Sequence, residues 1–156
     1  MSAGSNVGDD APAISATAVH ASAVDASAVV ALVVDASAVV DLLVNGRLLP
    51  RAGVLAAPAH MDAEVLSALG RLHRQGVLTA ADVEEMLDDL VALPVDRVSI
   101  GNLALRAFAL RDNVALRDGM YVALAQALDS PLDTTDARLA RACVDHQLCA
   151  LSGSVA

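Results

Sequence analysis

A continuous run of apolar, mostly branched residues opens the regular pattern of the chain. It covers residues 29–34 (Val-Val-Ala-Leu-Val-Val), and Asp35 follows it directly. Such a run is typical of a fully buried strand in a parallel sheet, because neither face of that strand meets solvent. Further short strands are predicted at residues 53–58, 95–98 and 132–134, and residues 148–151 are a candidate to close the sheet.

Segments with helical spacing separate these strands. Thr79 with Asp82 three residues later is a helix N-cap pattern, and Pro94 closes the helix that follows. Asn45-Gly46 is typical of a left-handed helix stop. The other predicted helices cover residues 37–44, 61–75, 101–111, 117–128 and 136–146.

The alternation of short strands and helices decides the predicted fold class. It implies right-handed crossovers, a mostly parallel sheet and helices on both faces of that sheet. The 156 residues leave room for one domain, which we expect over residues 29–156. Residues 1–28 are mostly small and cannot bury much surface, so they predict a disordered or poorly ordered extension.

Charge and composition exclude several classes of protein. The chain has 19 acidic and 10 basic residues, and every basic residue is arginine. The absence of lysine excludes phosphate-loop NTPases, protein kinases, Schiff-base enzymes and response-regulator receivers, each of which needs a lysine amine. The net charge of −9 argues against a broad basic face for nucleic acid. A base-stacking surface is not expected either, because the chain has only one Tyr and one Phe.

Three observations bear on location. Cys143 and Cys149 lack metal-ligand spacing and do not suggest a disulfide framework, so reduced thiols are expected. No basic residue precedes Arg47, which argues against a secretory signal. The apolar run over residues 26–34 is far too short for a membrane-spanning helix. The sequence therefore predicts a soluble cytoplasmic protein.

Four carboxylates are predicted at the edge where the parallel strands end. Asp35 follows the first strand, and Glu64, Asp118 and Asp136 lie at helix starts. Each alone has an ordinary explanation, because acidic residues commonly cap helices or favour the positive end of the helix dipole. No cationic partner is expected for Glu64, because its neighbours three and four residues away are mostly small or apolar.

Together, these acids predict a metal site. Like charges about 5 Å apart repel by roughly 3 kcal/mol per pair at an effective dielectric constant of about 20. One or two divalent cations would offset this repulsion, and an all-oxygen ligand set selects Mg²⁺ or Mn²⁺. A metal held by carboxylates activates water and neutralises charge on a phosphodiester, which indicates hydrolytic phosphodiester chemistry.

A short repeat offers a second choice for the first acid. Asp25 and Asp35 both precede Ala-Ser-Ala-Val-Val. We prefer Asp35 because a branched, strand-like segment precedes it, whereas the residues before Asp25 are not of this kind. Asp133 is expected to face away from Thr134, because successive residues of a strand point to opposite faces.

The segments around the four acids, taken in order, resemble the motifs of a known family. They are residues 33–40 (VVDASAVV), 63–66 (AEVL), 117–125 (RDGMYVALA) and 134–140 (TTDARLA). The ordered set resembles the PIN-domain ribonucleases, and within them the VapC toxin group, over residues 29–151. The resemblance departs from the family pattern in the length of chain before the first strand and at Gly119-Met120, where small Ala-type residues are usual.

The resemblance implies a PIN-like three-layer α/β/α fold and Mg²⁺-dependent cleavage of RNA. It implies Asp35 and Asp118 as the principal metal ligands, with Glu64 orienting or activating the attacking water. Asp136 would assist a second metal or order the cluster, and Ser37 and Thr134 resemble supporting hydrogen-bond positions. The resemblance also implies a cognate antitoxin that blocks the site, and a homodimer.

Two other functions stay open at this point. A haloacid-dehalogenase-like phosphatase also places an Asp after its first strand, but it needs a second Asp two residues later, where this chain has Ser37. A catalytically inactive PIN-like module that only binds a partner is the non-enzymatic alternative. The arginines considered for contact with RNA phosphates or an antitoxin are Arg47, Arg71, Arg74 and Arg117, although scattered arginines are usually solvated.

Overall fold

A computed structural model describes residues 31–50 and 52–153 of the chain. The predicted extension over residues 1–28 and the alternative acid Asp25 lie outside these residues, as do the first two positions of the strand predicted over residues 29–34. Every structural statement below concerns the described residues.

The centre of the fold is a four-stranded sheet in which all neighbouring strands are parallel. The order across the sheet is β3-β2-β1-β4. The strands are β1 (Ala31–Val34), β2 (Val54–Pro58), β3 (Val95–Val98) and β4 (Leu132–Asp133). All four lie where the sequence predicted them. The expected closing strand over residues 148–151 is reduced to one parallel bridge between Leu132 and Leu151.

The register aligns the ends of the central strands. Val33 of β1 pairs with Ala56 of β2 and with Leu132 of β4, and Val34 pairs with Asp133. The residues that follow β1 and β4 therefore leave the sheet side by side, at the same edge.

The helices also follow the sequence pattern closely. The Thr79 cap is confirmed as a capping box with Asp82, and Gly46 ends the first helix in the left-handed region, with φ of 67°. One prediction was wrong, because the helix expected over residues 101–111 is divided in two. The helical segments are α1 (Ala36–Asn45), α2 (Met61–Arg74), α3 (Ala80–Ala92), the 3₁₀ turn Ile100–Asn102, α4 (Ala104–Ala109), α5 (Leu116–Leu128) and α6 (Ala137–Asp145).

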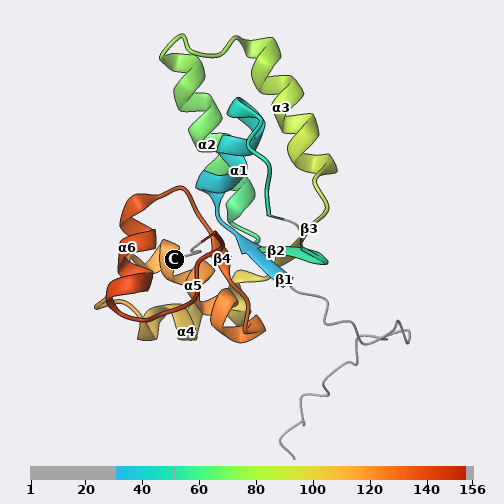
Figure 1. The fold of residues 1–156 in the computed structure, drawn as a ribbon. Helices are drawn as coiled ribbons and strands as arrows, with labels where there is room; N and C mark the ends of the chain where they lie inside the picture. The colour runs from blue at the N-terminus through green and yellow to red at the C-terminus, as the bar shows by residue number, and fades with distance from the viewer. Residues whose placement is uncertain (1–30, 51, 154–156) are drawn as a thin grey trace, which may run out of the picture.

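The helices form two groups, one on each side of the sheet. The chain steps from β1 to β2 to β3 and then returns past β1 to β4, so right-handed crossovers place α1–α3 and α4–α5 on opposite faces. Figure 1 shows α1, α2 and α3 together at the top and α4, α5 and α6 at the lower left. The predicted three-layer α/β/α fold class is confirmed.

The core is built between the sheet and α5. Helix α5 packs against β1, β2 and β4, and its residues 121–125 are all buried. Tyr121 is the largest fully buried side chain, and it packs near Leu32, Val33 and Val34 of the same core. The buried middle of α5 fixes the direction of the helix and thus of its first turn, which carries Asp118.

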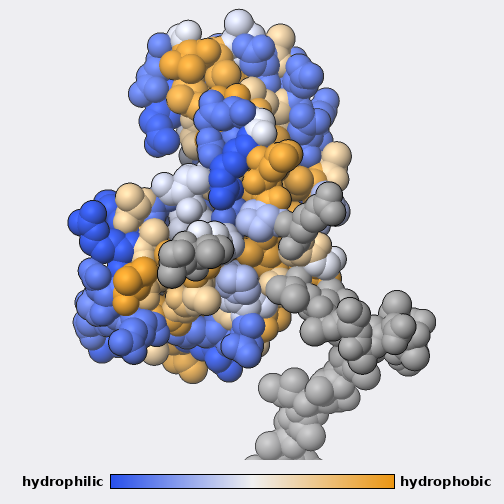
Figure 2. Space-filling model, viewed as in Figure 1, coloured by the Kyte–Doolittle hydropathy of each residue, from blue (hydrophilic) through white to orange (hydrophobic). Residues whose placement is uncertain are grey.

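None of the helices in the described part of the chain is long and apolar enough to cross a membrane. Polar and apolar side chains are mixed over the face seen in Figure 2, which is hollowed between the two groups of helices.

Candidate active site

The main pocket lies between the two groups of helices and has a volume of about 660 Å³. Its walls come from α1, α2 and the first turn of α5, with the loop before α6 at one end. All four acids singled out from the sequence line this one pocket: Asp35, Glu64, Asp118 and Asp136.

The sheet topology explains why these residues meet. The chain leaves β1 towards β2 on one side, and β4 lies on the other side of β1. The crevice between β1 and β4 is thus the switch point of the sheet, where parallel α/β proteins bind ligands beyond the carboxyl ends of the strands. Asp35 follows β1, and Thr134 to Asp136 follow β4, so both segments open into the crevice.

Asp35 is the most buried of the four acids, with only 4% of its surface exposed. It is the N-cap of α1, and its Oδ1 accepts hydrogen bonds from the Ala38 backbone N–H at 2.9 Å and from Ser37 Oγ at 2.7 Å. Its Oδ2 accepts a bond of 2.6 Å from Thr134 Oγ1. The capping role and the position in the pocket therefore belong to the same side chain.

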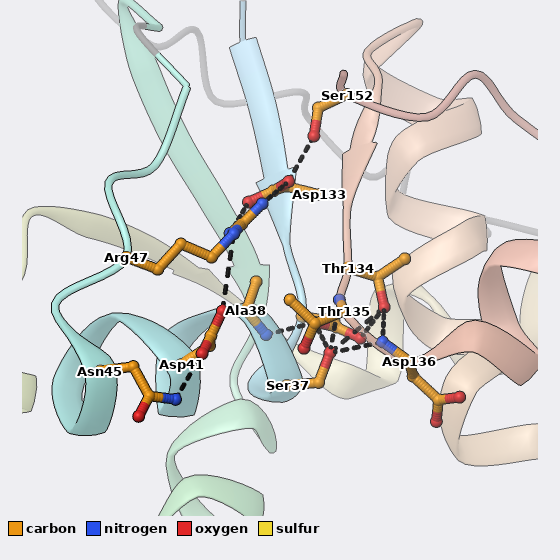
Figure 3. A network of polar contacts seen from close by, with 11 residues as sticks. Ser37, Ala38, Asp41, Asn45, Arg47, Asp133, Thr134, Thr135, Asp136 and Ser152 are labelled. Carbon is orange, nitrogen blue, oxygen red and sulfur yellow. Dashed lines mark hydrogen bonds and ion pairs between the residues drawn. The ribbon is translucent and has the colours of Figure 1, made fainter. Parts of the chain in front are cut away.

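Ser37 and Thr134 join the two halves of the crevice, as Figure 3 shows. Each hydroxyl donates its only proton to Asp35, which leaves its oxygen free to accept. Ser37 Oγ accepts from the backbone N–H groups of Thr135 and Asp136 at 2.9 and 3.0 Å, and Thr134 Oγ1 also accepts from Asp136 N–H at 3.0 Å. The loop after β4 is thus fastened to the first turn of α1.

Burial raises the pKa of Asp35 above its ordinary value. The hydrogen bonds from Thr134, Ala38 and Ser37 oppose this shift, and the nearby charge of Asp136 adds to it. A buried carboxylate with a second acid beside it is stabilised by positive charge in the pocket.

Asp136 begins α6 as its N-cap. Its Oδ1 accepts from the backbone N–H of Arg138 at 2.8 Å and, more weakly, from that of Leu139 at 3.4 Å. Like Asp35, it lines the pocket while it caps a helix.

Glu64 has two close partners on α5, which corrects the expectation that no cationic side chain lies within its reach. Arg117 Nε is 2.6 Å from Glu64 Oε1, and the Tyr121 hydroxyl donates to Glu64 Oε2 at 2.6 Å. The prediction failed because it considered only neighbours on the same helix, whereas both partners lie more than 50 residues further along the chain. Burial and the bond to Glu64 raise the pKa of Tyr121, so its phenol stays protonated.

His60 completes the surroundings of Glu64. Its ring lies 4.9 Å from the Tyr121 ring, centroid to centroid, and its Nε2 is 3.6 Å from Glu64 Oε2. That distance is too long for a hydrogen bond, and both ring nitrogens are buried with no hydrogen-bond partner among residues 31–50 and 52–153. His60 precedes Glu64 by four residues, so the helical spacing was the available signal that the two side chains share a face.

Asp118 lies in the first turn of α5 and is half-buried. Burial raises its pKa, and the charges of Asp136 and Glu64 raise it further, against a weaker opposite effect of Arg117 and Arg138. Asp118 therefore lies within electrostatic reach of Asp136 and of Glu64.

The donor chemistry of the pocket fits a hard divalent cation. Asp35, Glu64, Asp118 and Asp136 offer carboxylate oxygens, which Mg²⁺ and Mn²⁺ prefer. Within residues 31–50 and 52–153, no three His, Cys, Asp or Glu side chains surround a single point closely enough to hold an ion as they stand. The carboxylates of Asp35 and Asp136 accept hydrogen bonds from backbone N–H groups. The carboxylate of Glu64 instead contacts Arg117 and Tyr121.

Asp133 faces away from the pocket, as its alternation with Thr134 indicated. It is 1% exposed and forms a two-pronged ion pair with Arg47, with N–O distances of 2.7 and 2.8 Å (Figure 3). Ser152 Oγ also donates to it. Arg47 is therefore held within the fold, which argues against the contact with RNA or antitoxin considered for it.

Comparison with known proteins decides the family. The family model of the PIN domain matches residues 23–145. The chain belongs to the PIN domain family. Among relatives of this PIN-domain chain, Ribonuclease VapC3 of Mycobacterium tuberculosis is 51% identical over 86 residues, or 55% of this chain and 63% of VapC3. The match thus spans less than two thirds of that relative's length.

Two further VapC proteins of Mycobacterium tuberculosis are matched over a larger share of their length. Ribonuclease VapC9 is 39% identical over 60% of this chain and 73% of its own length, and Ribonuclease VapC12 is 35% identical over 58% and 70%. The crystal structure of PAE2754 from Pyrobaculum aerophilum superposes with a TM-score of 0.56, covering 77% of this chain and 88% of that one. At 20% identity, this likeness supports the fold alone.

The phosphatase alternative gains no support from the site. Its second acid would stand at position 37, where the Ser37 hydroxyl instead hydrogen-bonds to Asp35. The PIN-domain relatives that we find are named ribonucleases, and none of those described above is named a phosphatase.

Proposed function

We propose that this PIN-domain protein is a divalent-metal-dependent endoribonuclease that acts as the toxin of a toxin–antitoxin pair. The observation that carries the proposal is the convergence of four carboxylates from distant segments on one pocket at the switch point of the sheet. The ribonuclease names of the VapC relatives support the same activity.

Asp35 and Asp118 are the proposed principal ligands of Mg²⁺ or Mn²⁺, with Asp136 ordering the cluster or assisting a second ion. When bound, the cation would neutralise charge on the scissile phosphodiester and lower the pKa of a coordinated water. Asp35 has little freedom to move, because three donors hold its two oxygens. This fixed position favours catalysis, because the ligand need not be ordered when substrate binds.

Glu64 is proposed to orient the attacking water. Tyr121 and Arg117 fix the direction of its carboxylate from one side, through bonds of 2.6 Å each. Arg117 is exposed and can turn from Glu64 towards a phosphate, whereas Tyr121 is buried and holds its bond. The two partners therefore have different proposed roles, one in binding RNA and the other in positioning Glu64.

The pocket continues from the acids along a groove between α1 and α2. Val40 and Val44 line one side and Ala68 and Leu72 the other, with Arg71 at the edge. RNA phosphates would contact Arg71 and Arg117, while the sugar and base edges lie against the apolar walls. The family resemblance further supports a cognate antitoxin that covers this pocket, a homodimer and a cytoplasmic location.

Cleavage of RNA by the purified protein tests the proposal. Mg²⁺ or Mn²⁺ should support internal cleavage, and EDTA should abolish it. Asp35→Asn and Asp118→Asn should each lower the rate by roughly 100-fold or more, because each removes charge from the site. Asp88→Asn, an exposed acid of α3, is the matched control and should leave the rate unchanged.

The outcomes separate the proposal from its alternatives. Unchanged cleavage in the Asp35 and Asp118 variants would refute the assignment of the site. A folded protein that cleaves no RNA with any divalent cation but binds its antitoxin would favour the inactive partner-binding module. Hydrolysis of a phosphate monoester in place of RNA would favour the phosphatase.

A further inference from the structure

The only two cysteines of the chain lie together at the far end of α6 from the acidic site. Cys143 is in the last turns of α6, and Cys149 is in the segment that follows the helix. Their sulfur atoms are 3.4 Å apart. Two sulfurs bond at about 2.05 Å, so a disulfide requires them to approach by about 1.4 Å.

The end of α6 brings the two thiols together by its backbone geometry. The Leu148 N–H donates to Cys143 O at 2.9 Å, and the Gln147 N–H donates to Val144 O at 3.2 Å. This is the double hydrogen-bond pattern of a Schellman helix stop, and Gln147 takes the required left-handed conformation, with φ of 51°. The turn reverses the chain and places Cys149 against Cys143.

The segment that carries Cys149 is also held from its other side. The Leu148 carbonyl accepts from Gln126 Nε2 at 2.9 Å, and the Ala150 carbonyl accepts from the Leu132 N–H at 2.9 Å. The Ser152 N–H in turn donates to Leu132 O at 2.9 Å. Because neither sulfur lies on a free tail, their proximity is a property of the folded chain.

The two thiols differ in access. Cys143 is fully buried, whereas Cys149 is part-buried and lines a second pocket of about 300 Å³ between α5 and the segment 148–150. A small oxidant in this pocket meets Cys149 first. A Cys149 thiolate can accept a hydrogen bond from the Cys143 thiol over the 3.4 Å between the sulfurs, which lowers the pKa of Cys149, the more accessible of the two.

We propose that Cys143 and Cys149 form a redox site, in which a peroxide converts the two thiols to a disulfide that joins α6 to the segment 148–152. The Cys149 thiolate attacks one oxygen of hydrogen peroxide and breaks the O–O bond, which gives a sulfenic acid on Cys149 and a hydroxide ion; the hydroxide takes up the proton that the Cys149 thiol released and becomes the first water. The Cys143 sulfur then attacks the Cys149 sulfur, the S–O bond breaks, and the hydroxide leaves as a second water with the Cys143 proton. The thiols lose two electrons, and hydrogen peroxide is reduced to two waters.

The disulfide has a defined structural consequence. Segment 148–152 borders β4 through Leu132, and Ser152 donates to Asp133, the residue before Thr134. A disulfide between Cys143 and Cys149 links segment 148–152 covalently to α6, the helix whose N-cap is Asp136. The oxidised protein should therefore melt at a higher temperature, by roughly 5 °C, because the bond restricts the unfolded chain. This proposal does not depend on the ribonuclease activity.

The sequence makes the test unusually direct. Trypsin cuts after Arg141, and the product, residues 142–156, contains both cysteines and no methionine. The full-length folded protein is treated with hydrogen peroxide, and free thiols are then blocked with N-ethylmaleimide. The protein is digested with trypsin, and the mass of the peptide 142–156 is measured by mass spectrometry. The expected product is the peptide without N-ethylmaleimide, about 2 Da lighter than the same peptide with two free thiols, because the disulfide has lost two hydrogens. A dithiol reductant should restore the two thiols and the original mass. A fully blocked peptide, or one joined to a second copy, would overturn the proposal.

Single-cysteine variants test the order of the steps. Cys143→Ser leaves Cys149 alone, and its sulfenic acid should be trapped by dimedone after peroxide treatment. Cys149→Ser leaves the buried Cys143, which should resist labelling in the folded protein. Cys143→Ala serves as a second variant in case serine disturbs the core, with circular dichroism as the check on folding. Faster labelling of Cys143 than of Cys149 would contradict the proposed order.

Discussion

The carboxylate of Asp35 shows how one side chain both caps a helix and lines the pocket. Its position directly after an apolar strand was readable from the sequence, and so was the hydroxyl two residues later. The partner of Asp35 across the crevice, Thr134, lies 99 residues away, and only the family resemblance pointed to it. Arg117 and Tyr121 were missed as partners of Glu64, because local spacing carries no information about contacts between helices.

Ser37 offers a test of the hydrogen bonds around Asp35. Ser37→Ala removes the acceptor of two backbone N–H groups and one donor to Asp35. We expect it to lower the free energy of unfolding by roughly 1–2 kcal/mol, because Asp35 loses a donor and the Thr135 N–H loses its acceptor, while the Asp136 N–H keeps its bond to Thr134 Oγ1. Urea unfolding measures the effect. Ser67→Ala, which removes one exposed bond to Ala63 O, is the matched control and should change stability by less than about 0.5 kcal/mol.

Tyr121 tests the positioning of Glu64. Tyr121→Phe keeps the buried ring and removes only the hydroxyl that donates to Glu64. If Glu64 orients water, kcat for RNA cleavage should fall by roughly 10-fold while KM changes little, because the bond holds a reacting group and not the substrate. An unchanged kcat in a folded Tyr121→Phe protein would argue against this role for Glu64.

At the scale of elements, most helices and strands follow from local sequence. The capping box at Thr79 and the stop at Gly46 fixed two helix ends within a residue or two. The helix predicted over residues 101–111 was wrong because a 3₁₀ turn at Ile100–Asn102 precedes a short α4, and Gly101 and Asn102 are poor helix formers. No apolar pattern distinguishes such a break from a continuous helix.

The end of α6 gives a prediction about an element boundary. Gln147 holds a left-handed conformation that costs free energy for a residue with a Cβ. Gln147→Gly should raise the free energy of unfolding by roughly 0.5–1 kcal/mol, because glycine is the preferred residue at this position of a helix stop. Thermal unfolding of the reduced protein measures it. A lower free energy of unfolding in Gln147→Gly would contradict the prediction. It would show that the Gln147 side chain stabilises the fold by more than the left-handed backbone conformation costs.

The ion pair between Arg47 and Asp133 ties the end of α1 to β4 and predicts a dependence on pH. Burial opposes the charged form of Asp133, but the bonds from Arg47 and Ser152 outweigh it, so the pKa lies below the ordinary value of 3.8. A lowered folded-state pKa contributes stability that is fully present above the ordinary value. That contribution is lost as pH falls through the lowered pKa.

Asp133→Asn should therefore lower the free energy of unfolding by about 2 kcal/mol at neutral pH, since Arg47 remains partly solvated. The difference between wild type and variant should shrink below about pH 4, where the unfolded chain gains a proton at Asp133. Urea unfolding between pH 7 and pH 3 provides the measurement. A difference that grows with acidification would contradict the assigned direction of the shift.

At the scale of the whole molecule, the fold class was predictable because strand and helix alternate, and a parallel sheet then has few possible topologies. The strand order β3-β2-β1-β4 was not predictable from the pattern, since it depends on which edge receives β4. The strand order determines where the candidate site lies, because it brings Asp35 and Asp136 to the same crevice. The pattern could therefore indicate which acids to consider, but not how their side chains are turned.

The proposed metal binding predicts a change in stability, because a bound cation would offset the repulsion among the acids. A cation that binds only the folded chain raises the free energy of unfolding by about 2.7 kcal/mol when its concentration is about 100 times its Kd. Adding Mg²⁺ or Mn²⁺ should raise the Tm of wild type and of Asp88→Asn by several degrees and that of Asp118→Asn by much less. Differential scanning fluorimetry provides the measurement. An equal rise in all three proteins would place the cation elsewhere.

The separation of the site residues along the chain has a consequence for synthesis on the ribosome. Asp35 is made early, but the loop that bonds to it lies about 100 residues later, and the segment that borders β4 follows still later. A growing chain thus has no complete crevice until nearly all of it has emerged from the exit tunnel. If the proposed ribonuclease activity is correct, the nascent chain cannot cleave the messenger RNA that encodes it until translation has almost finished.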